Sequence, residues 1–468
     1  MLKLYNSLGN KIQAFKPIKG GQVTIYSCGP TVYGRAHIGN LSSFLFSDLL
    51  KRYLRYRGYK VAHAMNLTDV DDKTIKGSQQ AHLPLETYTA PFIAGFFKDL
   101  RDLNIAPADY YPRATQYVPK MVELVKLLLV NGSAYRGQDN SIYFNIKSFP
   151  RYGQLINLKK QRLKDGARIS SDDYDKEQAS DFVLWKAWQP SDGDIFWDTD
   201  IGKGRPGWHL ECSVMSTSLL GKTIDIHTGG IDLKFPHHSN EIAQSESAYK
   251  RLFVRYWLHR AFLQMGRERM AKRLGNVLNL TDLVKQGHSP RAFRFLILTN
   301  HYRTPLIFAE KTLVYAENSL KTIDEFVGRL EKIISAGGQY RSSKDILKFK
   351  KEFIKNLDSD LNSPKAIALL FDYIRKINIQ INKERLSVKE AKIILNFLKD
   401  IDRVWGFIFP LENRRELADE EKILLEARKN ARQNKDFAKS DQIRQELLKK
   451  GVEVRDGKDG EQTWVFLK

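Results

Sequence analysis

Residues 28–40 read CGPTVYGRAHIGN, and the pattern around them decides the fold. Before this stretch, apolar and polar residues alternate over 23–25, which predicts a β-strand. After it, apolar residues recur at three- and four-residue steps over 38–53, which predicts an amphipathic helix that Gly58 ends. A second strand is predicted over 59–67. A strand, a turn, a helix and a strand in this order predict a right-handed parallel crossover, with the turn at the sheet edge where ligands bind.

The turn brings His37, Gly39 and Asn40 to the N-terminus of the predicted helix. Free N–H groups and the helix dipole favour phosphate at such a position, and glycine lets a phosphate come close. A His-x-Gly turn by itself is more often an ordinary loop than a phosphate site. The turn alone therefore leaves both interpretations open.

Four stretches of the chain resemble a single protein family. The sequence CGPTVYGRAHIGN is similar to the nucleotide-binding His-Ile-Gly-His motif of the class I aminoacyl-tRNA synthetases, in the form used by cysteinyl-tRNA synthetases. NLTDVDDK at 66–73, GRPGWHLECSVM at 204–215 and FPHHSNEIAQSE at 235–246 match the same family in the same order. The fourth motif position, commonly His, is Asn40 here. The resemblance implies a cysteine–tRNA ligase that makes cysteinyl-adenylate and pyrophosphate from ATP, then transfers cysteine to the 3′-terminal ribose of its tRNA.

Sequence pattern and resemblance together predict an α/β fold. We expect a split, Rossmann-like, doubly wound parallel sheet with an inserted connective peptide, then an α-helical bundle and a small C-terminal α/β anticodon-binding module. The expected segments are the first catalytic half at 1–115, the connective peptide at 116–200, the second catalytic half at 201–260, a stem-contact region at 261–320, a tRNA-binding bundle at 321–411 and the anticodon module at 412–468.

The composition favours a polyanionic partner. Lys and Arg number 76 against 54 Asp and Glu, which gives a formal net charge of +22. Such a balance suits nucleic acid, although a basic proteome or simple solubility would give it too. The sequence contains no long apolar run and no signal-peptide core, so we expect a cytoplasmic protein without a membrane segment. The resemblance implies tRNA(Cys), ATP and L-cysteine as partners, and a monomer.

The chain has two cysteines, Cys28 and Cys212. By themselves, two distant cysteines are more often buried, reduced thiols than a metal site. His237 and Glu241 are four residues apart in a helical stretch, so both side chains share one helix face. The resemblance matches these four residues to the family's zinc ligands, and it alone selects His237 over the neighbouring His238. Zinc bound there would select the substrate thiol over the hydroxyl of serine and would not activate water.

The matched motifs also imply which residues contact the amino acid. These are Gly29, Thr68, Trp208 and His227, although Trp208 could equally belong to a core. The segment TIDIHTGG at 223–230 predicts a strand ending in paired glycines, which an ordinary turn would also explain. The implied ATP contacts, with Mg²⁺ accompanying ATP, are His37, Gly39, Asn40, Gly229, Asp232, Arg269 and Lys272. Among them, the expected catalytic residues are His37, Asn40 and Lys272.

The lysine loop, residues 269–276, is the largest departure from the family pattern. The family's Lys-Met-Ser-Lys-Ser aligns with Arg269, Met270, Ala271, Lys272 and Arg273, so only the second lysine is retained. Lys272 can still meet the pyrophosphate as a point charge, whereas the other changes bear on loop closure and rate. A solvated basic loop would be the default interpretation without this context. A second departure is residue 239, which is serine where the family usually has glutamate.

Two alternative functions stay open at this point. The first is a related ligase that joins cysteine to an amino sugar through the same adenylate, but that enzyme lacks an anticodon-binding end, which residues 412–468 resemble. The second is a tRNA-binding or regulatory protein without catalysis, for which the altered lysine loop is the only support.

Overall fold

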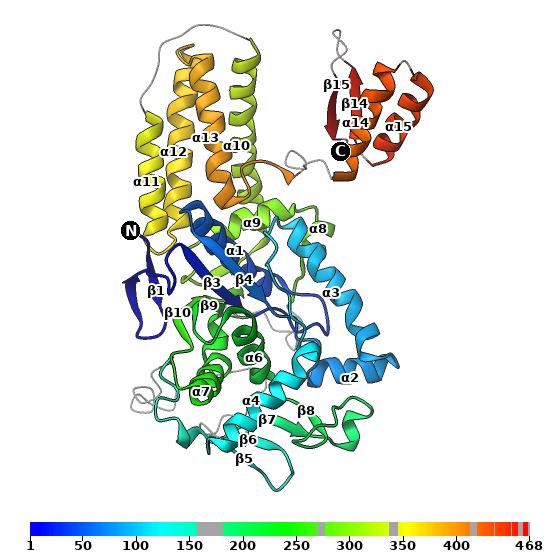
Figure 1. The fold of residues 1–468 in the computed structure, drawn as a ribbon. Helices are drawn as coiled ribbons and strands as arrows, with labels where there is room; N and C mark the ends of the chain where they lie inside the picture. The colour runs from blue at the N-terminus through cyan, green and yellow to red at the C-terminus, as the bar shows by residue number, and fades with distance from the viewer. Residues whose placement is uncertain are drawn as a thin grey trace. The chain divides into compact units, whose positions relative to one another are not determined.

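The computed structural model describes residues 1–156, 181–266, 268–269, 277–336, 345–411, 419–434, 436–450, 452–456 and 462–466. The chain forms two compact units, Met1–Gly406 and Phe407–Lys468 (Figure 1). Among the described residues, no helix combines the length and the apolar character needed to cross a membrane.

A four-stranded parallel sheet lies at the centre of the first unit, in the order β10-β9-β3-β4. Its strands are β3 (Gln22–Ser27), β4 (Lys60–Met65), β9 (Ile224–Gly230) and β10 (Val254–Arg260). The chain winds outward from β3 to β4 and, in the opposite direction, from β9 to β10. The strand order therefore reverses between β3 and β9, and a crevice at the carboxyl ends of these two strands is where a doubly wound sheet binds its ligands.

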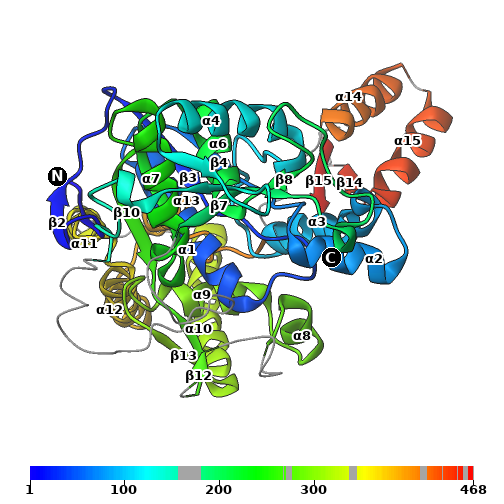
Figure 2. The same ribbon diagram turned by 90° about the horizontal axis from the view of Figure 1, so that it is seen from below.

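Helices cover both faces of this sheet. Figure 2 shows α6 (Trp208–Leu220) and α7 (His237–Tyr249) on one side and α1 (Ile38–Tyr56) on the other. Strand β9 is almost wholly buried, as a central strand covered on both faces must be. The predicted helix after the His-x-Gly turn is confirmed as α1, and Gly58 follows its end with a φ of +89°, a left-handed conformation that favours glycine.

A second, antiparallel sheet and several helices surround this centre within the first unit. The sheet has the order β5-β6-β7-β8, and Figure 1 shows it at the end of the unit opposite the helical bundle. The elements are β5 (Ala134–Arg136), β6 (Ile142–Phe144), β7 (Phe182–Ala187), β8 (Gly204–Pro206), α2 (Asp72–Ala81), α3 (Leu85–Asp102), α4 (Val118–Val130) and the N-terminal hairpin β1 (Lys3–Asn6) and β2 (Lys11–Ala14).

After β10 the chain forms a small sheet and then the bundle. The sheet has the order β12-β11-β13, with β11 (Leu263–Met265), β12 (Glu268–Arg269) and β13 (Leu306–Phe308). Between β12 and β13 lie α8 (Leu280–Lys285) and α9 (Pro290–Leu298). The bundle consists of α10 (Glu310–Ala336), α11 (Asp345–Asp358), α12 (Ser363–Asn382) and α13 (Val388–Trp405).

The second unit is a small α/β module, as predicted. Its elements are α14 (Asp419–Gln433), α15 (Phe437–Lys449), β14 (Val452–Asp456) and β15 (Gln462–Phe466), and the two strands form an antiparallel hairpin. Its core contains Leu425, Ile443, Leu447, Val452 and Val454. The predicted fold class of split parallel sheet, insertion, helical bundle and C-terminal module is therefore confirmed.

A buried ion pair joins helix α1 to the bundle. Arg294 on α9 donates to Asp48 Oδ2 at 2.6 Å and to the carbonyl of Trp405, at the end of α13, at 2.6 Å. Arg52 adds two further bonds to Asp48. Burial would raise the pKa of Asp48, but the two guanidinium groups outweigh it and lower that pKa. The stabilisation from Asp48 is therefore present above the pKa of an unfolded aspartate, about 3.9, and is lost as the pH falls below it.

Replacing this carboxylate should destabilise the first unit strongly. We expect Asp48→Asn to lower the free energy of unfolding by about 3–5 kcal/mol, because Arg294 would stay buried without its counter-ion. The measurement is the shift of the urea midpoint followed by tryptophan fluorescence. Asp324→Asn, in the more exposed pair with Arg291, is the matched control and should cost less than about 1 kcal/mol. Equal shifts in the two variants would contradict this assignment.

Candidate active site

The candidate site begins where β3 ends, because the backbone there lies close against the loop that follows β4. A Cβ atom on residue 29 would lie 1.8 Å from the carbonyl oxygen of Asn66, so only glycine fits. The Gly29 N–H donates to Asn66 Oδ1 at 2.8 Å, and Asn66 Nδ2 donates to Thr68 Oγ1 at 3.1 Å. Thr68 in turn donates to Glu211 Oε2 at 2.9 Å. These bonds join the loops after β3 and β4 to helix α6.

Four side chains with metal-ligating atoms converge beside this turn. The ligand atoms of Cys28, Cys212, His237 and Glu241 all lie within 4.8 Å of one another. The two sulfur atoms are 4.0 Å apart, and His237 Nε2 is 3.2 Å from Glu241 Oε1. Ligand atoms around tetrahedral zinc are separated by about 3.3–3.8 Å, given bonds of about 2.0–2.3 Å. The four residues that the resemblance selected are therefore gathered at a spacing close to that of a zinc site.

A second set of side chains overlaps the first. Cys28, His227, His238 and Glu241 also lie within 4.8 Å of one another. His238 Nε2 is 3.3 Å from Cys28 Sγ, and His227 Nε2 is 3.0 Å from Glu241 Oε2. The geometry thus supports two sets that share a thiol and a carboxylate. The first set has two sulfur atoms and is the better match to zinc, which is borderline soft.

Neighbouring groups orient both competing histidines. His237 Nδ1 is 2.8 Å from Nδ1 of His209, and His238 Nδ1 is 2.8 Å from Nε2 of His259. His259 Nδ1 continues to Ser7 Oγ at 2.8 Å. A ligating histidine usually has its second ring nitrogen held in this way, so each Nε2 is directed toward the thiols and the carboxylate.

The surroundings disfavour charge on these ligands in the metal-free protein. Burial raises the pKa of Cys28, and the adjacent Cys212 raises it further. Burial also raises the pKa of Glu241 and lowers the pKa values of His237 and His238. Because zinc binds the thiolate and the carboxylate, metal binding must overcome this preference and release protons.

The residues expected to contact the amino acid have different surroundings. Trp208 begins α6 and is 39% exposed, and its ring lies against that of His237 at a tilt of 37°, with ring centroids 4.3 Å apart. The alternative that Trp208 belongs to a core does not fit this exposure. His227 is fully buried, stacks on Trp257 and pairs with Glu241, and Thr68 is buried between Asn66 and Glu211. Their contacts with substrate stay predictions.

The nucleotide motif forms the N-terminal cap of α1. His37 is the N-cap, its Nδ1 accepts the Asn40 N–H at 3.2 Å, and the side chain of Asn40 accepts the His37 N–H at 3.4 Å. This reciprocal pair is a capping box, a pattern that the spacing of the two residues could have indicated. A Cβ on residue 39 would lie 2.8 Å from His37 Nδ1, so glycine keeps the turn open.

The structure describes the first residue of the lysine loop, Arg269, and the chain that follows the loop from residue 277. β12 ends at Arg269, and the Ile38 N–H donates to the carbonyl of Leu278 at 2.8 Å, beside a backbone bridge between His37 and Asn279. The segment after the loop is therefore hydrogen-bonded to the nucleotide motif. Met270, Ala271, Lys272 and Arg273 lie outside the described residues, as does the side chain of Arg269.

The remaining predicted residues lie at the carboxyl end of β9. Gly229 is the last residue but one of that strand and lies next to His238, whose ring a Cβ would approach to 2.7 Å. Asp232 follows in a short 3₁₀ turn. Ser239, the second departure from the family pattern, is buried and donates to the carbonyl of Lys234 at 2.8 Å. Glu211 was not singled out from the sequence as a site residue. It accepts the hydrogen bond from Thr68, and it stands three residues after Trp208 within the same matched motif.

Comparisons with known proteins cover nearly the whole chain. The family model for the tRNA synthetases class I (C) catalytic domain matches residues 14–318, that for the DALR domain matches 352–409, and that for the Cysteinyl-tRNA ligase anticodon binding domain matches 414–464. A cysteine–tRNA ligase of Chlamydia trachomatis is 46% identical over 479 residues, which is 98% of each chain. One from Brachyspira hyodysenteriae is 42% identical over 97% of this chain and 98% of its own length. The chain belongs to the cysteine–tRNA ligase family.

A solved structure supports the fold of this cysteine–tRNA ligase family member. Mycobacterium tuberculosis methionyl-tRNA synthetase in complex with methionyl-adenylate superimposes with a TM-score of 0.60 at 13% identity, covering 83% of this chain and 88% of that one. At this identity the likeness concerns the fold alone. The family resemblance inferred from four motifs is confirmed.

One ligand set contains His237 and the other contains His238. Replacing each histidine in turn should therefore show which set binds the metal. If zinc binds the set with two sulfur atoms, His237→Asn should reduce bound zinc from about one per chain to well below half, whereas His238→Asn should retain it. Metal content of the purified variants by mass spectrometry tests this, with the melting temperature as a folding control. Zinc lost from His238→Asn and kept in His237→Asn would assign the site to the other set.

Proposed function

We propose that this chain is a cysteine–tRNA ligase that activates L-cysteine with ATP and transfers it to tRNA(Cys). The observation that carries the proposal is that two different groups share one edge of the sheet. One is the N-terminus of α1, capped by His37, which suits phosphate. The other is the cluster containing Cys28 and Cys212, which suits a thiol-selective metal. A reaction that joins cysteine to a nucleotide needs both.

The first step is adenylate formation. A carboxylate oxygen of cysteine attacks the α-phosphorus of ATP, and the bond from that phosphorus to pyrophosphate breaks. Because the carboxylate is already ionised, the step needs positioning and positive charge more than a base. Gly39, Gly229 and Asp232 shape the nucleotide site, and Mg²⁺ accompanies the phosphates. Lys272, with Arg269 nearby in sequence, stabilises the charge that develops on pyrophosphate.

His37 is suited to donate to a phosphate oxygen. Its Nδ1 accepts the Asn40 N–H, so the neutral ring carries its proton on Nε2. Asn40 supports this arrangement by accepting the His37 N–H. The two residues thus fix the helix end and the tautomer together.

Selection of cysteine would depend on the metal cluster. Cys28, Cys212, His237 and Glu241 would hold zinc, which when bound supplies a Lewis acid that favours the thiolate form of the substrate. A site that must be ligated rejects serine far more strongly than a hydrophobic pocket rejects an analogue of equal size. On the protein side, Trp208 would pack against the amino acid, and Thr68 and Gly29 would line the turn beside it. His227 would orient Glu241 through the contact between its Nε2 and the Glu241 carboxylate.

In the second step, cysteine is transferred to tRNA. A hydroxyl of the 3′-terminal ribose attacks the carbonyl carbon of the adenylate, and AMP leaves. The match of residues 414–464 to an anticodon-binding domain supports tRNA over an amino sugar as the acceptor. The boundaries of the six segments stay a proposal, in which residues 321–411 and 412–468 bind the tRNA. A monomer in the cytoplasm stays a prediction.

The decisive test is charging in the presence of a competitor. We expect the purified protein with ATP, Mg²⁺, labelled cysteine and total tRNA to place label on the RNA, and a large excess of unlabelled serine to leave the rate unchanged. Acid-precipitable radioactivity is the measurement. Exchange of pyrophosphate without charging would favour the sugar ligase. Absence of both, in zinc-loaded protein, would favour a non-catalytic tRNA-binding protein.

The C-terminal module should affect tRNA binding without affecting adenylate formation. Trp464 lies on β15 and is 38% exposed. Base stacking on an aromatic ring is worth about 1–3 kcal/mol, so we expect Trp464→Ala to raise the KM for tRNA about tenfold. Cysteine-dependent ATP–pyrophosphate exchange, which needs no tRNA, should stay at the wild-type rate. A loss of exchange equal to the loss of charging would count against a separate anticodon contact.

A further inference from the structure

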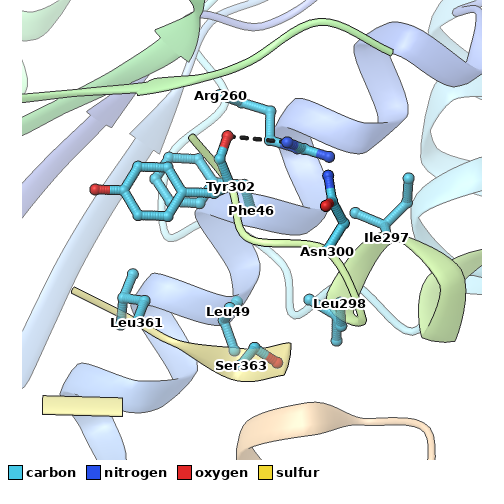
Figure 3. A pocket seen from close by; sticks show the side chains of 9 residues that line it. All are labelled: Phe46, Leu49, Arg260, Ile297, Leu298, Asn300, Tyr302, Leu361 and Ser363. Atoms are coloured by element: carbon cyan, nitrogen blue, oxygen red, sulfur yellow. Dashed lines mark hydrogen bonds between the residues drawn. The ribbon is translucent and has the colours of Figure 1, made fainter. Parts of the chain in front are cut away.

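Arg260 is a buried cation at the carboxyl end of strand β10. It is 1% exposed and pairs in register with Gly230, next to the predicted nucleotide contacts. Its Nη1 donates to three carbonyls of one turn, those of His301 at 3.4 Å, Tyr302 at 2.9 Å and Thr304 at 3.1 Å. Figure 3 shows the guanidinium reaching the Tyr302 carbonyl across one end of a small cavity.

Arg260 lies beside a cavity too small for a ligand, and among the described residues its bonds go to backbone carbonyls. The cavity beside it measures about 10 Å³, too small for an amino acid or a nucleotide. No carboxylate within ion-pair distance of Arg260 is found among the described residues, and its Nη2 is buried without a hydrogen-bond partner among them. Arg294, equally buried, has Asp48 as its counter-ion. Burying a charge without a counter-ion is unfavourable, so the three carbonyls of the turn 301–304 are what compensates the Arg260 guanidinium.

The turn that Arg260 holds is connected to the base of the lysine loop through three paired strands. It runs into β13, which pairs in parallel with β11, and β11 pairs with β12, which ends at Arg269. The Ala261 N–H donates to the carbonyl of Tyr302 at 2.8 Å, and the Leu306 N–H to that of Phe262 at 3.0 Å. Arg260 therefore fixes the strand on which the hairpin β11–β12 is aligned.

The bundle holds the same turn from the other side through Asp360. Its carboxylate accepts bonds from Tyr302 Oη at 2.6 Å and Arg303 Nε at 2.7 Å, and its carbonyl oxygen is 3.0 Å from His301 Nε2. Asp360 and Leu361 both have left-handed φ angles, +57° and +52°, which residues with a Cβ rarely adopt. The strained loop between α11 and α12 is thus tied to the turn.

We propose that Arg260 is a positioning residue for adenylate formation, which sets the base of the lysine loop by holding the turn 301–304 against Asp360. The inference rests on the proposed function, because Arg260 acts through Lys272. Arg260 from the sheet and Asp360 from the bundle both bind the turn 301–304, and together they determine where the loop starts.

The test is a double-mutant cycle in the ATP–pyrophosphate exchange assay. We expect Arg260→Met to lower the exchange kcat at least about tenfold, with the KM for cysteine within about twofold and the zinc content unchanged. Arg260→Lys should recover most of the rate, because an ammonium group can still donate to the carbonyls. In a Lys272→Ala background, Arg260→Met should lower the remaining rate by less than about twofold, since residues acting through one another are not additive.

The matched control is Arg291→Met, on α9 and away from this turn, which should leave exchange unchanged in both backgrounds. An equal loss from Arg260→Met with and without Lys272 would overturn the inference, and so would an unchanged kcat. If the methionine variant fails to fold, Arg260→Lys enters the same cycle, and its smaller loss must also vanish without Lys272. Wild-type protein without cysteine-dependent exchange would instead contradict the proposed function.

Discussion

The pairing of β3 with β9 is the interaction on which the rest of the structure depends. These strands are about two hundred residues apart in the sequence, yet Ile25, Tyr26 and Ser27 lie in register with Ile226, His227 and Thr228. Buried polar groups fix the register, since Ser27 Oγ and Thr228 Oγ1 are 2.7 Å apart and Asp225 accepts the Thr24 N–H at 3.0 Å. A shift by one residue would turn each of these side chains to the opposite face.

The same register gathers the candidate site. The Cys28 N–H donates to the carbonyl of Thr228, so the residue after β3 is bound to the end of β9. Cys212 and Glu241 then approach from two helices packed on the same face. A metal ion held by this set would connect a strand end to α6 and α7, so its binding free energy would also contribute to the stability of the catalytic half.

Local sequence patterns predicted the elements of this half better than their contacts. Spacing along the chain was sufficient to indicate β3, α1, α6 and β9, although α6 and β9 are buried on nearly every side. The identity of the metal ligands came only from the family resemblance. His237 and His238 are adjacent in the first turn of α7, and both reach the cluster, so spacing cannot separate them. The histidine pairs and the bond from Thr68 to Glu211 join distant segments and leave no local signal.

The short link between the second sheet and helix α6 limits how this protein can change in length. Strand β8 ends at Pro206 and α6 begins at Trp208, so Cys212 stands only six residues beyond the last strand of the second sheet. Each residue of an α-helix turns the chain by about 100°. A single codon gained or lost between Trp208 and Cys212 would therefore rotate the thiol away from its partners. Substitutions in the second sheet can therefore be tolerated more readily than an insertion or a deletion at this link.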